Sequence, residues 1–185
     1  MFSDNYNEKK IIVLTGPEST GKTTLGRQLA QRYNNGVFVP EYAREYVEKL
    51  QCVNRSYTYE DVETIAQHQV TNLIEAQSRF TFDTQYVFVD TYLIITKIWF
   101  IHCYKSYPQW IDESLRHFHV NMVLLCKPDL PWKPDPVREN GDDEMRNVLY
   151  NEYLQEIKAF GFPYSEIGGV GEERLQNALA ALSKI

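Results

Sequence analysis

Residues 16–23 decide the fold, and they run Gly16-Pro17-Glu18-Ser19-Thr20-Gly21-Lys22-Thr23, with the spacing G-x-x-x-x-G-K-T. An apolar, β-branched run from Ile11 to Thr15 precedes this stretch, and a helix-like segment from Thr24 to Tyr33 follows it. A strand, a glycine-rich turn and a helix in this order form a phosphate-binding loop. The sequence therefore predicts a nucleoside triphosphate site at the end of the first strand.

The residue types in this loop match the chemistry of binding an anion. Glycines let the backbone wrap around phosphate with its N–H groups pointing inward, and the N-terminus of the next helix adds its dipole. We expect Lys22 to reach the terminal phosphates and the Thr23 hydroxyl to bind a magnesium ion. The predicted nucleotide-binding residues are Gly16, Pro17, Glu18, Ser19, Thr20, Gly21, Lys22, Thr23 and Thr24.

Composition restricts the possible partners and locations. The net charge of the 185 residues is -6 and no long basic run occurs, which disfavours nucleic acid and anionic membrane surfaces as partners. No apolar stretch has the length of a membrane span, and the N-terminus lacks a signal-peptide core. The three cysteines show no CxxC spacing, which suits reduced thiols, so we expect a cytoplasmic protein.

Strand-like and helix-like segments alternate along the whole chain. The expected strands are residues 10–15, 37–39, 86–90, 120–126 and 164–167, and a helical pattern follows each of them. This alternation, with one phosphate loop at its start, predicts an α/β P-loop NTPase fold with a five-stranded parallel sheet covered on both faces. We expect residues 1–185 to form a single domain, with residues 1–9 as a flexible tail.

Two of these strands end next to charged residues. Glu41 and Arg44 follow the second strand, and ligands of open α/β sheets bind outside the carboxyl ends of the strands. Both residues also fit a helix start with ordinary surface charges. Asp90 ends the apolar run that begins at Tyr86, as in a Walker B strand whose carboxylate meets the metal.

A proline-rich segment follows the fourth strand and predicts a lid at about residues 128–146. A small sheet with a lid that carries proline and arginine is typical of nucleoside and nucleotide kinases. No N-K-x-D-type guanine signature is present, although the sequence does not decide between ATP and GTP. In such kinases catalysis is mainly positioning and charge neutralisation around the transferred phosphoryl group.

Four motifs together resemble the nicotinamide riboside kinase domain of the bacterial NadR family. They are G-P-E-S-T-G-K-T at 16–23, P-E-Y-A-R-E-Y at 40–46, F-V-D-T at 88–91 and P-D-L-P-W-x-x-D-P-x-R-E at 128–139. The resemblance extends from about Lys10 to the last helix. It implies transfer of the γ-phosphoryl group of ATP, with Mg²⁺, to the 5′-hydroxyl of nicotinamide riboside. No H-x-G-H motif of an adenylyltransferase is present, so we expect a stand-alone kinase.

The resemblance also implies roles for individual residues. Lys22 and the loop backbone would hold the triphosphate, while Thr23 would bind magnesium directly and Asp90 through water. Either Asp90 or Glu41 would accept the hydroxyl proton, and the sequence does not choose between them. Arg138 and Arg44, with Arg146 as a further candidate, would offset charge on the transferred group, since arginine binds phosphate oxygens bidentately; Arg138 would thereby also contact the nucleotide.

The remaining candidates concern the substrate ring and sugar. Trp132 and Tyr42 offer flat surfaces for a pyridinium ring, although Trp132 is equally suited to anchoring the lid on the core. Asp135 is a candidate for ribose hydroxyls or the cationic base. The segment from Gly168 to Arg174 is expected near the adenine.

Two alternative functions fit the same sequence. One is a kinase for another nucleoside or nucleoside monophosphate on this scaffold. The other is a nucleotide-dependent binding or regulatory module, for which an acidic chain without a basic cluster is a poor match to lipid headgroups. The oligomeric state is not readable from the sequence.

Overall fold

The computed structural model describes residues 9–33, 35–78, 85–134, 137 and 142–185. In this part of the chain the strands are β1 (Lys10–Thr15), β2 (Val37–Val39), β3 (Tyr86–Asp90), β4 (Met122–Cys126) and β5 (Tyr164–Ile167). They form one parallel sheet in the order β2-β3-β1-β4-β5. The predicted α/β fold with a five-stranded parallel sheet is confirmed.

Helices connect the strands in the expected alternation. They are α1 (Lys22–Arg32), α2 (Tyr42–Cys52), α3 (Tyr59–Ser78), α4 (Leu93–Tyr104), α5 (Trp110–His117), α6 (Asp143–Ala159) and α7 (Glu172–Leu182). The first helix begins at Lys22, not at Thr24 as expected, because Gly21 adopts a left-handed conformation (φ 77°) and turns the chain directly into the helix.

The fourth strand, in contrast, begins later than expected, at Met122 instead of Val120. The cause lies at Asn121, whose side-chain oxygen accepts a hydrogen bond from the Ile11 backbone N–H at 2.7 Å. The Ile11 N–H thus bonds to a side chain, while the Asn121 N–H donates to the Ile11 carbonyl at 2.9 Å, and the paired register starts with Ile12 opposite Met122.

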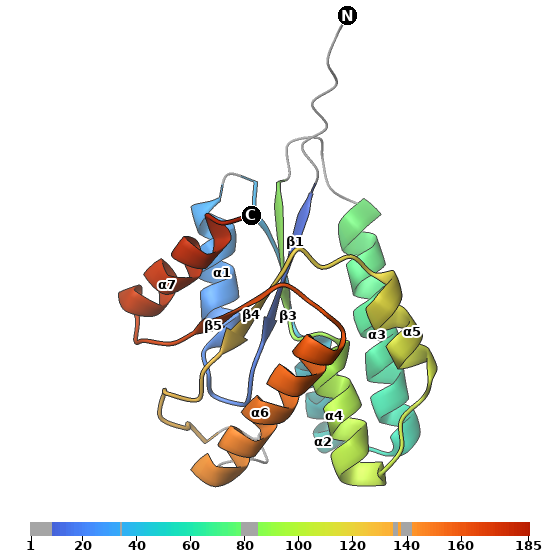
Figure 1. The fold of residues 1–185 in the computed structure, drawn as a ribbon. Helices are drawn as coiled ribbons and strands as arrows, with labels where there is room; N and C mark the ends of the chain where they lie inside the picture. Colours follow the sequence, from blue (N-terminus) through green and yellow to red (C-terminus); the bar gives the residue numbers. More distant parts are fainter. Residues whose placement is uncertain (1–8, 34, 79–84, 135–136, 138–141) are drawn as a thin grey trace, which may run out of the picture.

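Helices cover both faces of the sheet, as Figure 1 shows. Ile12 and Leu14 belong to the core on the side of α1 and α7, whereas Val13 points into the core beneath α3, α4, α5 and α6. Successive side chains of a strand point to opposite faces, so β1 contributes to both cores. Its continuous apolar run reflects this double burial.

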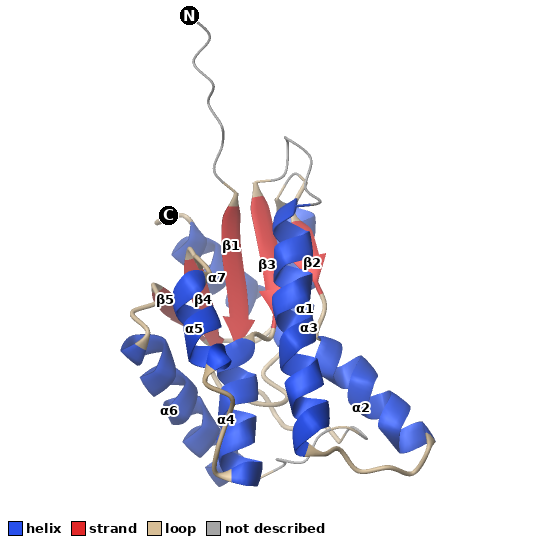
Figure 2. Cartoon of the chain, turned by 90° about the vertical axis from the view of Figure 1, so that its right-hand side faces the viewer, coloured by secondary structure: helices blue, strands red, loops and turns tan. Residues whose placement is uncertain are grey.

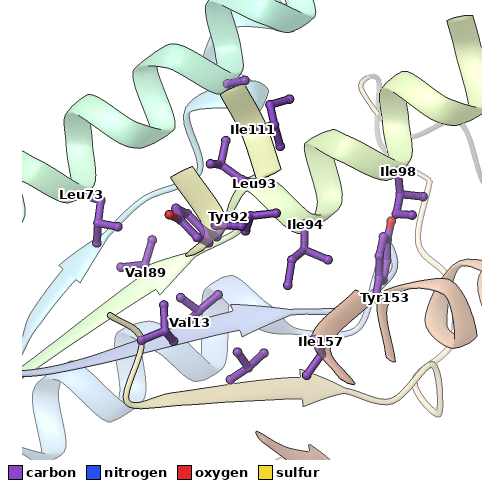
Figure 3. Packing of buried hydrophobic residues seen from close by; sticks show 14 of the residues in the cluster. Val13, Leu73, Val89, Tyr92, Leu93, Ile94, Ile98, Ile111, Tyr153 and Ile157 are labelled. Atoms are coloured by element: carbon purple, nitrogen blue, oxygen red, sulfur yellow. The ribbon is translucent and has the colours of Figure 1, made fainter. Parts of the chain in front are cut away.

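The larger core links the sheet to the helices that also border the site. Val13 and Val89 face Leu73 of α3 and Leu93 of α4, and Tyr153 of α6 lies beside Ile98 (Figure 3). This packing fixes α4 and α6 relative to the ends of β1 and β3. Within the described residues, no helix is both long and apolar enough to cross a lipid bilayer.

The carboxyl ends of the parallel strands meet at one edge of the sheet. Figure 2 shows this edge, with α2 and α4 extending beyond it. The phosphate loop follows β1, Glu41 follows β2, Thr91 follows β3, and the segment from Lys127 follows β4. Segments far apart in the sequence therefore converge here, where ligands of such sheets bind.

Candidate active site

The phosphate loop has the backbone that its glycines predict. Gly16 has φ 143°, and a Cβ atom there would lie 2.6 Å from the carbonyl oxygen of Cys126. Ser19 adopts φ 58°, a left-handed conformation in which non-glycine residues are uncommon. The Thr20 hydroxyl ties the turn together by donating to the Pro17 carbonyl at 2.9 Å. These features produce a tight cradle of the kind that binds anions.

Lys22 lies across this cradle. Its ammonium group donates to the carbonyl oxygens of Gly16, at 2.8 Å, and of Pro17, at 2.9 Å. These neutral acceptors orient the side chain without cancelling its charge. The cation is therefore held at the mouth of the loop, where it can attract phosphate.

Thr23 and Asp90 form the second element of the site. The β1–β3 register sets Asp90 beside Leu14, next to the start of the loop, and the Thr23 hydroxyl donates to Asp90 Oδ2 at 2.5 Å. Asp90 is only 1% exposed, and its Oδ1 has no hydrogen-bond partner among the described residues. A hydroxyl next to a carboxylate with a spare oxygen fits a magnesium ion, which prefers oxygen ligands.

Two acids near Lys22 have raised pKa values. Burial raises the pKa of Asp90, although Lys22 and the Thr23 hydrogen bond act in the opposite direction. Burial also raises the pKa of Glu41, which Lys22 lowers and the charge of Asp90 raises further. Carboxylates with raised pKa values beside a cation are typical of groups that exchange protons.

A cavity of about 310 Å³ extends from the phosphate loop into the space between α2, α3, α4 and α6. Glu41 lines it near the loop, together with Arg44. Thr91 also lines it and is held in a left-handed conformation (φ 68°) while its N–H donates to the Leu14 carbonyl at 3.1 Å. The volume of the cavity suits a small organic ligand.

The far wall of this cavity is aromatic. Tyr57 and Trp99 line it, with ring centroids 4.8 Å apart and an interplanar angle of 80°. Neither residue is among those that the sequence predicted for the site. The useful indication was the position of Trp99 on a helix that starts directly after the Walker B-like strand.

The structure places two of the predicted ring-binding residues elsewhere. The Tyr42 ring stacks on His68, with centroids 4.1 Å apart, and neither Tyr42 nor Trp132 is among the described residues that line the cavity. Trp132 is half-buried, and its indole N–H has no acceptor within the described part of the chain. Asp135 and Arg138 lie outside the described residues.

Arg146 joins the start of the expected lid to α6. Its side chain is 1% exposed and donates to Asp143 at 2.9 Å and to the Leu130 carbonyl at 2.9 Å. It therefore acts as an anchor of this segment. Nearby, the Lys133 N–H donates to the Ser19 hydroxyl at 3.2 Å, so the segment touches the phosphate loop itself.

The segment from Gly168 to Arg174, expected near the adenine, packs against the same region. The Gly169 N–H donates to Asp129 at 2.8 Å, and the Arg174 guanidinium pairs with the same carboxylate. Arg174 is buried and also donates to the backbone carbonyls of Gly169 and Ile167. The ends of β4 and β5 are thus fastened together beside the phosphate loop.

A parallel sheet in this order, with a phosphate loop after β1 and a buried acid at the end of β3, defines a P-loop nucleotide-binding domain of the small-kinase type. The chain belongs to the AAA domain family AAA_28, whose model matches residues 11–174.

A relative of known function is a NadR protein. The chain is 25% identical, over 152 residues, to the trifunctional NAD biosynthesis/regulator protein NadR of Salmonella typhimurium; the match covers 80% of this chain and 36% of that protein. The chain thus spans about a third of that relative's length.

Solved structures show the same fold. A NadR protein in complex with NR matches with a TM-score of 0.78 and 23% identity, over 95% of this chain and 51% of that chain. A NadR protein in complex with NAD and AMP-PNP gives a TM-score of 0.73, 24% identity and coverage of 95% and 49%. A deoxyadenosine kinase from M. mycoides gives a TM-score of 0.65, 14% identity and coverage of 95% and 100%.

Proposed function

We propose that this protein is a kinase that transfers the γ-phosphoryl group of ATP to the 5′-hydroxyl of nicotinamide riboside. The observation that carries the proposal is the continuous cavity, which joins the phosphate loop to Glu41 and then to the aromatic pair Tyr57 and Trp99. It offers one end for a triphosphate and another for a flat ring. The NadR complexes with NR and with AMP-PNP are consistent with both ligands.

The phosphate loop would hold the donor. Its backbone N–H groups and the Lys22 ammonium would bind the β- and γ-phosphates and stabilise the charge that develops during transfer. Thr23 and Asp90 would hold magnesium, which would neutralise the negative charge of the phosphate groups. The Thr23–Asp90 hydrogen bond already orients both oxygens before a ligand arrives.

Glu41 is our choice for the group that accepts the hydroxyl proton. It lines the cavity, whereas Asp90 is not among the described lining residues and already accepts the Thr23 hydrogen bond. The raised pKa of Glu41 favours proton uptake, and its position after β2 sets it at the same edge as the donor. Asp90 would then serve the metal.

The aromatic pair would hold the substrate ring. Nicotinamide riboside carries a cationic pyridinium ring, and such a ring is attracted to the face of tryptophan or tyrosine by about 0.5–2 kcal/mol. Because Trp99 and Tyr57 line the cavity, we assign ring binding to them in place of Trp132 and Tyr42. Arg44 lines the cavity and stays a candidate for the transferred phosphoryl group, as does Arg138 on sequence grounds.

The proposal is tested by offering a panel of acceptors with ATP and Mg²⁺ and following ADP release. The panel contains nicotinamide riboside, uridine, thymidine, thymidine monophosphate and deoxyadenosine. We expect nicotinamide riboside to have the highest kcat/KM. Preference for another acceptor would reassign the substrate, and ATP loss that no acceptor stimulates would favour a regulatory module.

A further inference from the structure

Gln69 is a buried amide in the wall of the cavity. It lies in the middle of α3 and is 5% exposed, and both Gln69 and Thr96 of α4 line the cavity. The Thr96 hydroxyl, itself 1% exposed, donates to Gln69 Oε1 at 2.7 Å. This hydrogen bond uses the oxygen of the amide and fixes which way the side chain points.

The amide nitrogen of Gln69 is left without a partner. Nε2 is buried and has no hydrogen-bond acceptor among the described residues. An amide NH₂ carries two donors, and a buried donor without an acceptor destabilises a protein unless a ligand supplies one. Because Gln69 lines the cavity, the missing acceptor belongs to whatever fills the cavity.

The place of Thr96 along α4 indicates which part of the ligand is concerned. The lining residues of α4 run from Ile95 and Thr96 through Trp99 to Cys103, away from the phosphate loop. Thr96 precedes Trp99 by three residues on α4, which is slightly less than one helical turn and a rise of about 4.5 Å. Thr96 and the Gln69 side chain that it holds thus lie at the level of the cavity next to the aromatic pair, beyond the end where phosphoryl transfer would take place.

We propose that Gln69 determines substrate specificity by donating a hydrogen bond from Nε2 to an acceptor oxygen carried by the planar ring of the nucleoside. In nicotinamide riboside this oxygen is that of the carboxamide group, an identity that rests on the proposed function. Thr96 is a positioning residue, because its hydroxyl holds the amide oxygen and turns the nitrogen toward the ligand.

The test compares two substrates in two proteins. The substrates are nicotinamide riboside and ribosylpyridinium, which lacks the carboxamide; the variant is Gln69→Met, which keeps side-chain length but has no donor. In the wild type we expect loss of the carboxamide to raise KM about tenfold. In Gln69→Met the two KM values should agree within about twofold.

Gln67→Met is the matched control, because Gln67 is exposed on the same helix and should retain the wild-type preference. Thr96→Val should lose part of the preference, since the amide is no longer oriented. Thermal denaturation of each variant separates lost recognition from lost folding.

Each result has a defined meaning. An undiminished carboxamide preference in Gln69→Met, or an equal KM increase for both substrates, would show that Gln69 does not recognise the ring substituent. If the wild type phosphorylates neither substrate, the proposed function fails. The same comparison made by calorimetric binding of the two nucleosides then still tests Gln69: equal affinities for the wild type would refute its role.

Discussion

At the residue scale, the site depends on charged groups that are oriented before any ligand binds. Lys22 is held by two carbonyl oxygens of its own loop, and the Thr23 hydroxyl is held by Asp90. Such preorganised groups contribute most to catalysis, because they need little rearrangement as charge develops. The contribution of each group can be measured by removing it.

Lys22→Ala should lower turnover at least about a hundredfold, since the variant loses the cation that stabilises the transferring phosphoryl group. Steady-state kinetics with ATP and the preferred acceptor measure this effect. The control is Lys49→Ala, because Lys49 is 68% exposed and pairs with Glu45 on the surface of α2. Equal losses in the two variants would contradict the role of Lys22.

Glu41→Gln should lower turnover at least about a hundredfold if Glu41 accepts the hydroxyl proton. The wild-type rate should fall as pH decreases through the raised pKa of Glu41, and the variant should lack this limb. Rate profiles from pH 5 to 9 provide the measurement. A variant that keeps both the rate and the acid limb would shift the role to Asp90.

Glu41→Gln should lower turnover but raise the stability of the folded protein. Because burial raises the folded-state pKa of Glu41 above its ordinary value of 4.5, the charged carboxylate destabilises the folded protein at pH values above the folded pKa. Glu41→Gln should therefore raise the Tm at pH 7, and the gain should disappear at pH values below about 4.5. A lower Tm at pH 7 would mean that the carboxylate is stabilising.

At the element scale, the phosphate loop is shaped by the strand beside it. Gly16 has no room for a side chain, because the carbonyl oxygen of Cys126 at the end of β4 lies only 2.6 Å from where its Cβ would be. The loop also contacts the segment after β4, through the hydrogen bond from Lys133 to Ser19. Substitutions in the segment after β4 should therefore alter the conformation of the phosphate loop.

Gly16→Ala should abolish measurable ATP binding, because the added methyl group must displace backbone and the required φ of 143° is unfavourable for alanine. Isothermal calorimetry with ATP and Mg²⁺ measures the loss. The control is Gly161→Ala, where φ is 70° but nothing lies within 4 Å of the added methyl, so ATP binding should persist. If Gly16→Ala binds ATP with wild-type affinity, the loop does not need the close contact between Gly16 and the Cys126 carbonyl.

At the scale of the whole molecule, the carboxyl ends of the five parallel strands meet at one edge of the sheet, and a ligand bound there should contact segments that follow several of them (Figure 2). Mg²⁺-ATP at about a hundred times its Kd should stabilise the folded chain by about 2.7 kcal/mol, a rise in Tm of about 5–10 °C. EDTA should remove much of this rise in the wild type. In Thr23→Val, which has lost the hydroxyl ligand, EDTA should have little further effect. Thermal denaturation of both proteins with and without EDTA measures these effects. A Tm rise that neither EDTA nor the Thr23→Val substitution reduces would exclude Thr23 from metal binding.

The sequence by itself determined the fold class, the phosphate loop, the acid that follows β2 and the acid that ends β3. These features are local: hydrophobic runs of strand length, glycines at a fixed spacing, and an acid at the end of an apolar run. Four of the strands occupy the expected residues, and the limits of the fourth depended on a distant partner, the side chain of Asn121 against Ile11.

The tertiary structure alone decided which side chains face the cavity. Tyr57, Gln69 and Trp99 come from separate elements, and nothing local distinguishes them from core residues. Tyr42, in contrast, was a reasonable choice from its position after β2, but its ring packs on His68. The physical reason is that the exact rotation of a helix about its axis, which selects the side chains that face the cavity, depends on how its apolar face packs against the neighbouring helices.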